Sequence, residues 1–152
     1  MGVFDFLPIF NQCCFCLNLK IGSILIAIWG ILSVGSFTYF AAFPVCFILE
    51  GIALTIMKIA RLFVYFCDGV LFITAIIFII GVFIKKSITA EIFLFGIALV
   101  LVGYMLYTIA TVITYILHEE CRYFVGPEGF TLNTFLWIYF MIIIRSYKEE
   151  ME

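Results

Sequence analysis

Charged residues are scarce in this sequence. Asp, Glu, Lys and Arg together make up 12% of the 152 residues, about half the share found in ordinary soluble domains. A water-soluble fold of this length could not cover its surface with so few charges, which excludes an ordinary globular domain. The net charge of -2 is also too small to indicate nucleic acid or a strongly acidic partner.

Patterns of catalytic residues are missing as well. We find no serine or cysteine placed beside a base, no glycine-rich phosphate loop and no pair of acids within an apolar stretch. The single histidine, His118, is followed by Glu119, Glu120 and Cys121. Consecutive residues of a helix point to different faces, so these four cannot easily converge on one metal ion. We therefore predict a non-enzymatic protein without a cofactor or a metal site.

Apolar residues, in contrast, make up 66% of the chain, against about 45–50% in soluble domains. They gather in four stretches, and a helix crosses a bilayer with about 20 such residues. The four stretches are residues 21–43, 62–84, 92–117 and 130–144. The predicted fold class is therefore all-α: an integral membrane protein of one domain, with four transmembrane helices in an antiparallel bundle.

Shorter polar segments separate these stretches. They are a tail at 1–20, a turn at 85–91, a loop at 118–129 and a tail at 145–152. Residues 44–61 are ambiguous, because Glu50, Lys58 and Arg61 fall on one helical face. This segment either forms an outer loop with a helix at the membrane surface or extends the second span.

Lysine and arginine residues predict the orientation. The side with both termini and the 85–91 turn carries five of them: Lys20, Lys85, Lys86, Arg145 and Lys148. The other side carries three: Lys58, Arg61 and Arg122. Because cytoplasmic segments carry an excess of these residues, we predict that both termini are cytoplasmic.

The cysteines fall into two groups. Cys13, Cys14 and Cys16 precede the first span on the cytoplasmic side and are candidates for palmitoylation, with no modification as the alternative. Cys46 and Cys121 fall in the outer loops, where disulfides persist, and form a candidate disulfide. Free thiols, or a bridge from either residue to Cys67, remain alternatives.

Asp68 is the only carboxylate well inside an apolar stretch. At the centre of a lipid-exposed helix such a group costs about 2.5–3.5 kcal/mol. It lies about two turns from the outer end of the predicted span, so we interpret it as a structural residue that reaches interfacial water or pairs with Arg61. A place on an ion or proton path is the alternative.

Small residues recur at helical spacings in two spans. Ser23, Ala27 and Gly30 share one face of the first span, and Gly96, Gly103 and Ala110 recur every seven residues in the third. Small residues let helices approach closely, so both sets are predicted packing seams.

Both ends of the chain resemble a known group of proteins. The runs CCFCLNLKIGSILIAIWGIL (residues 13–32) and FLWIYFMIIIRSYKEEME (residues 135–152) are similar to small insect four-pass proteins of the Pasiflora type and to the related lysosome-associated transmembrane (LAPTM) family. In that pattern a cysteine-rich tail runs through a basic residue and a glycine, here Lys20 and Gly22, into the first span. The resemblance implies four helices, cytoplasmic termini and a non-enzymatic role, in septate junctions or in endosomal trafficking.

Together these features predict an organising component of a membrane complex such as a septate-type junction, in the plasma membrane rather than the endolysosomal membrane. The expected partners are membrane lipids, other membrane proteins that bind laterally or at the outer loops, and a second copy of the chain. An endolysosomal trafficking adaptor is the first alternative, although the C-terminal tail has no proline for the proline-tyrosine motifs of the lysosomal proteins. A channel or transporter subunit is the second, with Asp68 as its only intramembrane charge.

Overall fold

The structure, a computed structural model, describes residues 7–10, 18–42, 51–117 and 127–151. All regular elements within these ranges are helices, and no strand occurs there. The helices are α1 (Leu19–Ala42), α2 (Ile52–Ile84), α3 (Ile88–Leu117) and α4 (Pro127–Met151). The all-α prediction is therefore confirmed at this level.

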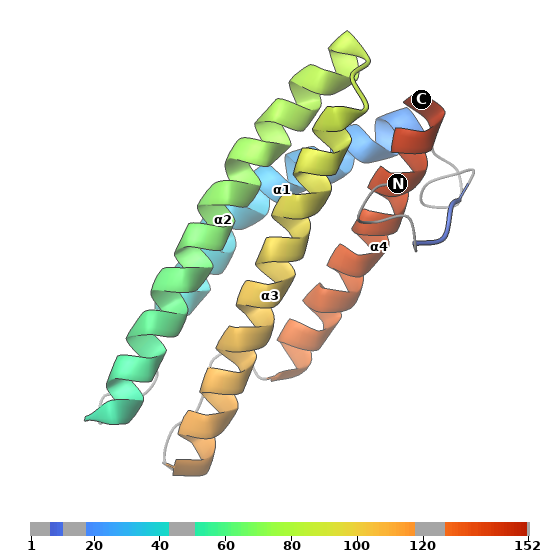
Figure 1. Cartoon of the computed structure of the whole chain (residues 1–152). Helices are drawn as coiled ribbons and strands as arrows, with labels where there is room; N and C mark the ends of the chain where they lie inside the picture. Colours follow the sequence, from blue (N-terminus) through green and yellow to red (C-terminus); the bar gives the residue numbers. More distant parts are fainter. Residues whose placement is uncertain (1–6, 11–17, 43–50, 118–126, 152) are drawn as a thin grey trace.

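The four helices pack in a ring in which each contacts the next along the chain and α4 contacts α1 (Figure 1). The α2–α3 interface is the most extensive. The start of α1, the connection between α2 and α3, and the end of α4 lie at one end of the bundle, which we call the turn end. The start of α2 and the end of α3 lie at the opposite end, which we call the loop end.

Two of the helices are long and apolar enough to cross a membrane. They are Leu54–Ile84 within α2 and Ile88–Thr114 within α3, with mean hydropathies of 2.6 and 2.3. At about 1.5 Å per residue, α2 extends roughly 50 Å and α3 roughly 45 Å. The described apolar part of α1, Leu19–Ser33, is shorter than either of these two candidate spans.

Helix boundaries differ from the predicted spans: α4 (Pro127–Met151) exceeds the predicted 130–144 span at both ends, and α2 and its connection to α3 differ at two places. α2 begins at Ile52, so most of the segment 44–61 extends the helix of the second span and does not form a separate helix. The α2–α3 connection spans only residues 85–87, because α3 already begins at Ile88. A helix can continue past the apolar stretch in both cases because each added residue gains a backbone hydrogen bond.

The connection is short because Lys85 turns the chain sharply. Its φ of 56° and ψ of 47° are left-handed, which ends α2. The Lys86 N–H then donates to the Gly81 carbonyl at 3.1 Å, and the Ala90 N–H donates to the Ser87 carbonyl at 3.0 Å as α3 begins. The turn therefore folds α3 back along α2 within three residues.

We expect Lys85→Gly to stabilise the protein. A left-handed conformation strains any residue that has a Cβ, and Lys85 is the only such non-glycine residue in the described ranges. Allowing for the flexibility of glycine in the unfolded chain, the gain should be about 0.5–1 kcal/mol, measured by thermal unfolding in detergent. Lys86→Gly is the matched control, which removes the same charge and should not stabilise; an equal gain in both variants would contradict the explanation.

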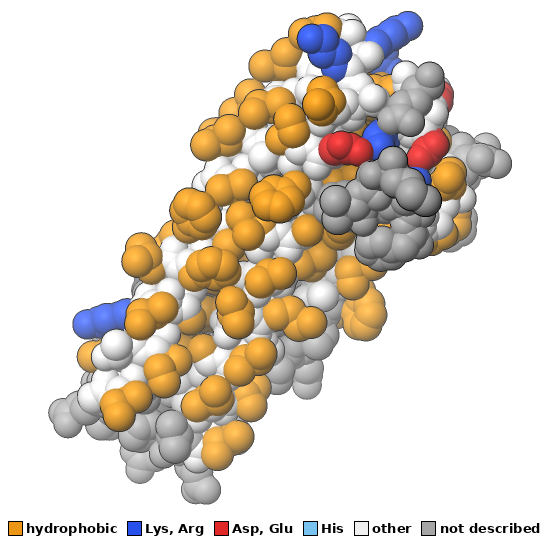
Figure 2. Space-filling model, viewed as in Figure 1, with side chains coloured by type: hydrophobic (Ala, Val, Ile, Leu, Met, Phe, Trp, Pro, Cys, Tyr) orange, Lys and Arg blue, Asp and Glu red, His pale blue; other side chains and the backbone are white. Residues whose placement is uncertain are grey.

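Large apolar side chains cover the outside of the bundle. Exposed examples occur on each helix, including Leu32 (67%), Phe83 (74%), Ile116 (71%) and Phe135 (70%). Figure 2 shows hydrophobic side chains along the length of the visible face, whereas most charged side chains there gather toward one end.

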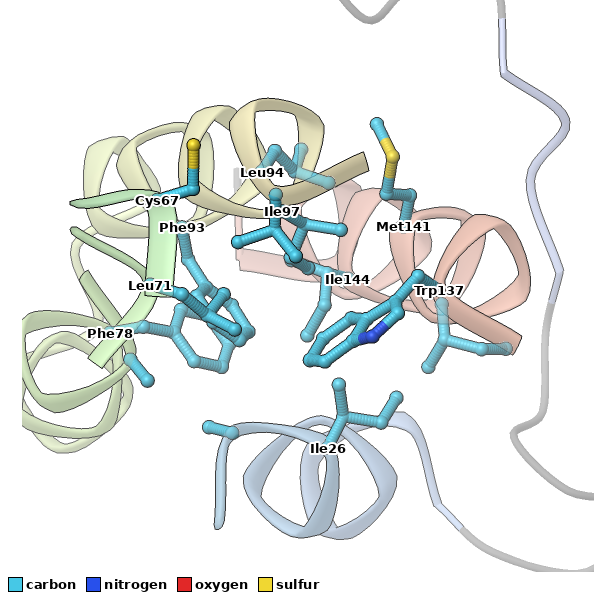
Figure 3. Close-up of a cluster of buried hydrophobic side chains, with 14 of the residues drawn as sticks. Ile26, Cys67, Leu71, Phe78, Phe93, Leu94, Ile97, Trp137, Met141 and Ile144 are labelled. Carbon is cyan, nitrogen blue, oxygen red and sulfur yellow. The ribbon is translucent and has the colours of Figure 1, made fainter. Parts of the chain in front are cut away.

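Large aromatic side chains also fill the inside. Trp137, Phe78 and Phe93 are completely buried, and the rings of Phe78 and Phe93 stack with their centroids 5.0 Å apart. Figure 3 shows these three residues converging from α2, α3 and α4, with Ile26 of α1 beside Trp137. We call Phe78, Phe93 and Trp137, with Leu71, Leu94 and Ile97, the aromatic layer.

Candidate functional site

Asp68 is the least expected residue of the interior. It lies midway along α2 and is 1% exposed. Neither of its carboxylate oxygens has a hydrogen-bond partner, although buried polar groups nearly always do. No hydrogen bond joins Asp68 to Arg61, so the predicted pairing of these residues is absent. The helix begins at Ile52, about four turns before Asp68, and the interpretation that Asp68 reaches interfacial water stays a prediction.

Three helices surround this carboxyl. Cys67 on α2 is buried as a free thiol, and Tyr104 on α3 is 2% exposed. Asp68 lies close enough for its charge to act on both. The Tyr104 hydroxyl also forms a hydrogen bond with the side chain of Asn133 on α4. Polar groups of α2 and α3 therefore meet at Asp68, and Asn133 of α4 is linked to them through Tyr104.

Hydroxyl groups continue from this point toward the loop end. Tyr104, Tyr107, Thr111 and Thr114 are spaced three or four residues apart on α3, which places them on one face. Each is at most 9% exposed, and we call these four residues the polar stripe. Thr111 and Thr114 donate to carbonyls of their own helix at 2.7 Å, so their oxygens can still accept.

Arg61 of α2 joins the polar stripe near the loop end. Its guanidinium forms a hydrogen bond with the Tyr107 hydroxyl. Arg61 is half-buried and lies about two helical turns from Asp68. A positive charge and a row of hydroxyls therefore lead from the loop end to the buried carboxyl.

A separate polar network lies at the turn end. Lys148 of α4 donates to Glu91 of α3 at 2.7 Å, and Arg145 donates to Glu149 one turn further along α4 at 2.7 Å. The backbone N–H of Phe10 donates to the Ser146 hydroxyl at 2.8 Å. These contacts fasten α3 and the described N-terminal residues to the last turns of α4.

Tyr147 belongs to the same region. It is 4% exposed, and its ring packs edge-on against Phe78 with centroids 6.3 Å apart. Burial raises the pKa of its hydroxyl, and the negative charge of Glu150 raises it further. The hydroxyl therefore stays protonated at neutral pH.

Small residues of the predicted seam in α3 face α2. A Cβ added at Gly96 would overlap the Thr74 side chain, and one added at Gly103 would lie 3.1 Å from the Cys67 sulfur. Ala110, one heptad further, is 5% exposed. These residues sit inside the α2–α3 interface of this chain.

The seam predicted in α1 is also internal. Ser23 and Ala27 are 0% exposed, and a Cβ at Gly30 would lie 3.6 Å from Trp137 and 3.8 Å from Phe93. Both seams therefore pack the helices of one chain together. A partner helix cannot reach these buried residues, so neither seam can supply the expected lateral contacts with other membrane proteins.

The candidate modification sites lie outside the described residues. This holds for Cys13, Cys14 and Cys16, the palmitoylation candidates, and for Cys46 and Cys121, the candidate disulfide. Palmitoylation and the disulfide therefore stay predictions.

The chain matches no protein-family model, no curated protein and no solved structure. The resemblance to Pasiflora-type and LAPTM proteins therefore stays a prediction.

Several residues of the site were missed by the sequence analysis. Tyr104 and Asn133 carry no signal on their own, because a single polar residue is common in an apolar helix. The spacing of Tyr104, Tyr107, Thr111 and Thr114 is a usable signal, since four hydroxyl residues share one face there.

Proposed function

We propose that this chain is a four-pass integral membrane protein with both termini in the cytoplasm. We further propose that it acts without catalysis as a structural or organising component of a membrane complex, such as a septate-type cell–cell junction. The observation that carries the proposal is the distribution of polarity: the bundle is apolar on the outside along its length and filled on the inside.

An exterior of this kind suits lipid rather than water. Exposing apolar surface to water costs about 25 cal/mol per Å², and soluble monomers rarely expose large continuous apolar patches. Leu32 on α1 and Phe135 on α4 are as exposed as the apolar residues of α2 and α3. This supports a lipid environment around all four helices and not only around the two longest.

The distribution of basic residues supports the orientation. Five of them belong to the segments that meet at the turn end: Lys20, Lys85, Lys86, Arg145 and Lys148. Within the described residues, Lys58 and Arg61 are the basic residues near the loop end. Because basic residues favour the cytoplasmic side, a cytoplasmic turn end is the consistent choice.

The filled interior favours an organising role over a channel or transporter subunit. Permeation requires a polar or hydrated route across the whole membrane. The aromatic layer, with Trp137, Phe78 and Phe93 completely buried, leaves no such route between the turn end and Asp68. Contacts with other proteins would then use the exposed apolar faces or the outer loops, since both small-residue seams are internal.

The end of α4 counts against the alternative of a trafficking adaptor. Sorting and ubiquitin-ligase motifs are read as accessible peptide segments. Here α4 continues to Met151, Tyr147 is 4% exposed and Ser146 accepts a hydrogen bond from Phe10. These residues serve the fold instead of forming a free tail.

The location of the protein tests this proposal. We expect the endogenous, tagged protein to concentrate at lateral borders of a polarised epithelium, and to leave them when neighbouring junction proteins are removed. Tags inserted at either terminus in separate lines control for mislocalisation caused by the tag. Enrichment of both tagged forms in acidic vesicles would contradict the junctional role and favour the trafficking alternative.

A further inference from the structure

We infer that Asp68 is a proton-binding site that exchanges with solution at the loop end of the bundle and is sealed from the turn end. The inference goes beyond the organising role, because it assigns a ligand to the interior of the bundle. It combines three observations: a buried carboxyl without a hydrogen-bond partner, a polar stripe on one side of it and an aromatic layer on the other.

The carboxyl itself indicates the ligand. Both oxygens are buried without a hydrogen bond, and an isolated ionised carboxylate is very costly to hold in an apolar interior. A bound proton removes the charge and so removes most of that cost. A metal ion would need several oxygen ligands, and the Tyr104 hydroxyl and the Asn133 amide are the polar side chains of α3 and α4 placed here by described contacts.

Neighbouring charges do not replace the proton. The titratable groups that act with Asp68 are Cys67 on α2 and Tyr104 on α3, and neither supplies a positive charge. Arg61 lies about two turns away and interacts with Tyr107. Within the described side chains of α1 and α4, the charged residues are Lys20, Arg145, Lys148, Glu149 and Glu150, all at the turn end.

The polar stripe provides the route toward the loop end. Tyr107, Thr111 and Thr114 offer hydroxyl oxygens along α3, and Arg61 stands beside Tyr107. A proton can move along hydroxyl groups and intervening water more easily than through apolar side chains. The buried carboxyl therefore communicates with the side of the membrane on which α2 begins.

The opposite direction is closed. Between Asp68 and the end of α2, the buried residues are apolar except Thr74 and Gly81. The Thr74 hydroxyl donates to the Leu71 carbonyl at 3.0 Å, and it is the only hydroxyl among these buried residues of α2, so no row of hydroxyls continues in this direction. Phe78, Phe93 and Trp137 then fill the bundle (Figure 3), so a proton on Asp68 cannot continue to the turn end. The site binds a proton from one side without transporting it.

Isotope labelling can observe this site selectively, because Asp5 and Asp68 are the only aspartates of the chain. The full-length Asp5→Asn protein, labelled with carboxyl-13C aspartate, contains a single labelled residue. In lipid vesicles whose inner and outer pH are set separately, infrared spectroscopy reports the protonated carboxyl band of Asp68. A protease-sensitive C-terminal tag shows which end faces outward.

We expect the labelled band to disappear as the pH at the loop end rises. Its intensity should not change with the pH at the turn end. Asp68→Asn in the same background should lose the band completely, and its thermal unfolding shows whether the fold survives. Tyr107→Phe should slow the loss of the band several-fold without removing it. A band that never responds to pH, or that follows the turn end, overturns the inference. If the band responded to Na⁺ at constant pH, the ligand of this site would be a metal ion and not a proton.

Discussion

Replacing Gly81 with alanine should cause one of the largest losses of stability that a single methyl group can cause in this protein. A Cβ at Gly81 would overlap the hydroxyl and the Cβ of Thr89 and would lie 2.6 Å from its Cγ2 atom. No rotation of Thr89 relieves this overlap, because its Cβ is fixed to the backbone of α3. The first turn of α3 must move away from α2, at a cost of about 3 kcal/mol.

Gly69→Ala is the matched control for Gly81→Ala. It lies in the same helix, and nothing lies within 4 Å of an added Cβ. Both variants improve helix propensity equally, so the difference between them isolates the contact with α3. Unfolding in lipid micelles with increasing denaturing detergent measures both free energies. Equal stabilities would show that α2 and α3 are further apart than described.

Trp137→Ala should destabilise the protein by a similar amount. Gly81→Ala adds an atom where there is no room, whereas Trp137→Ala removes a buried ring and leaves a cavity in the aromatic layer. Trp137 is 0% exposed, contacts Phe140 edge-on with ring centroids 5.5 Å apart, and lies 3.6 Å from the Cβ position of Gly30. In soluble cores such a truncation costs about 3–5 kcal/mol. In the proposed lipid environment, where lipid would replace water as the solvent, we expect only the part of this cost that comes from lost contacts, roughly 2–3 kcal/mol.

Phe135→Ala tests whether burial determines that loss. Phe135 lies two residues from Trp137 on the same helix but is 70% exposed, so its truncation removes few contacts. The same unfolding measurement should show a change of less than about 0.5 kcal/mol. A loss as large as that of Trp137→Ala would mean that α4 is rotated from its described orientation.

The sequence predicted helices well because apolar stretches of this length leave the backbone few alternatives. In an apolar solvent, the backbone N–H and C=O groups must form their hydrogen bonds within the helix. The apolar stretch from Ile92 to Leu117 therefore indicated a span without any information about tertiary contacts. The start of α2 at Ile52 was harder to predict. Lys58 and Arg61 suggested a boundary, yet a charged side chain does not end a helix.

The site around Asp68 depends on contacts between residues far apart in the sequence. Tyr104 and Asn133 meet only when α3 and α4 pack in one register, and hydropathy does not specify register. Gly96 and Gly103 do carry that information, because close approach is possible only where both helices present compatible side chains. The sequence predicted a seam but not its partner, which is α2 of the same chain.

The length of α2 bears on which membrane would hold this protein. From Arg61 to Lys85 the helix rises roughly 35 Å, with Asp68 as the only charge between them. In a plasma membrane with a hydrocarbon core of about 32–33 Å, a tilt near the usual 20° would match this length. In the thinner endoplasmic reticulum, about 27 Å, the same helix would have to tilt by roughly 40° or deform the bilayer. Bilayer thickness alone would thus favour movement of this protein from the endoplasmic reticulum to the plasma membrane, without a sorting signal in the sequence.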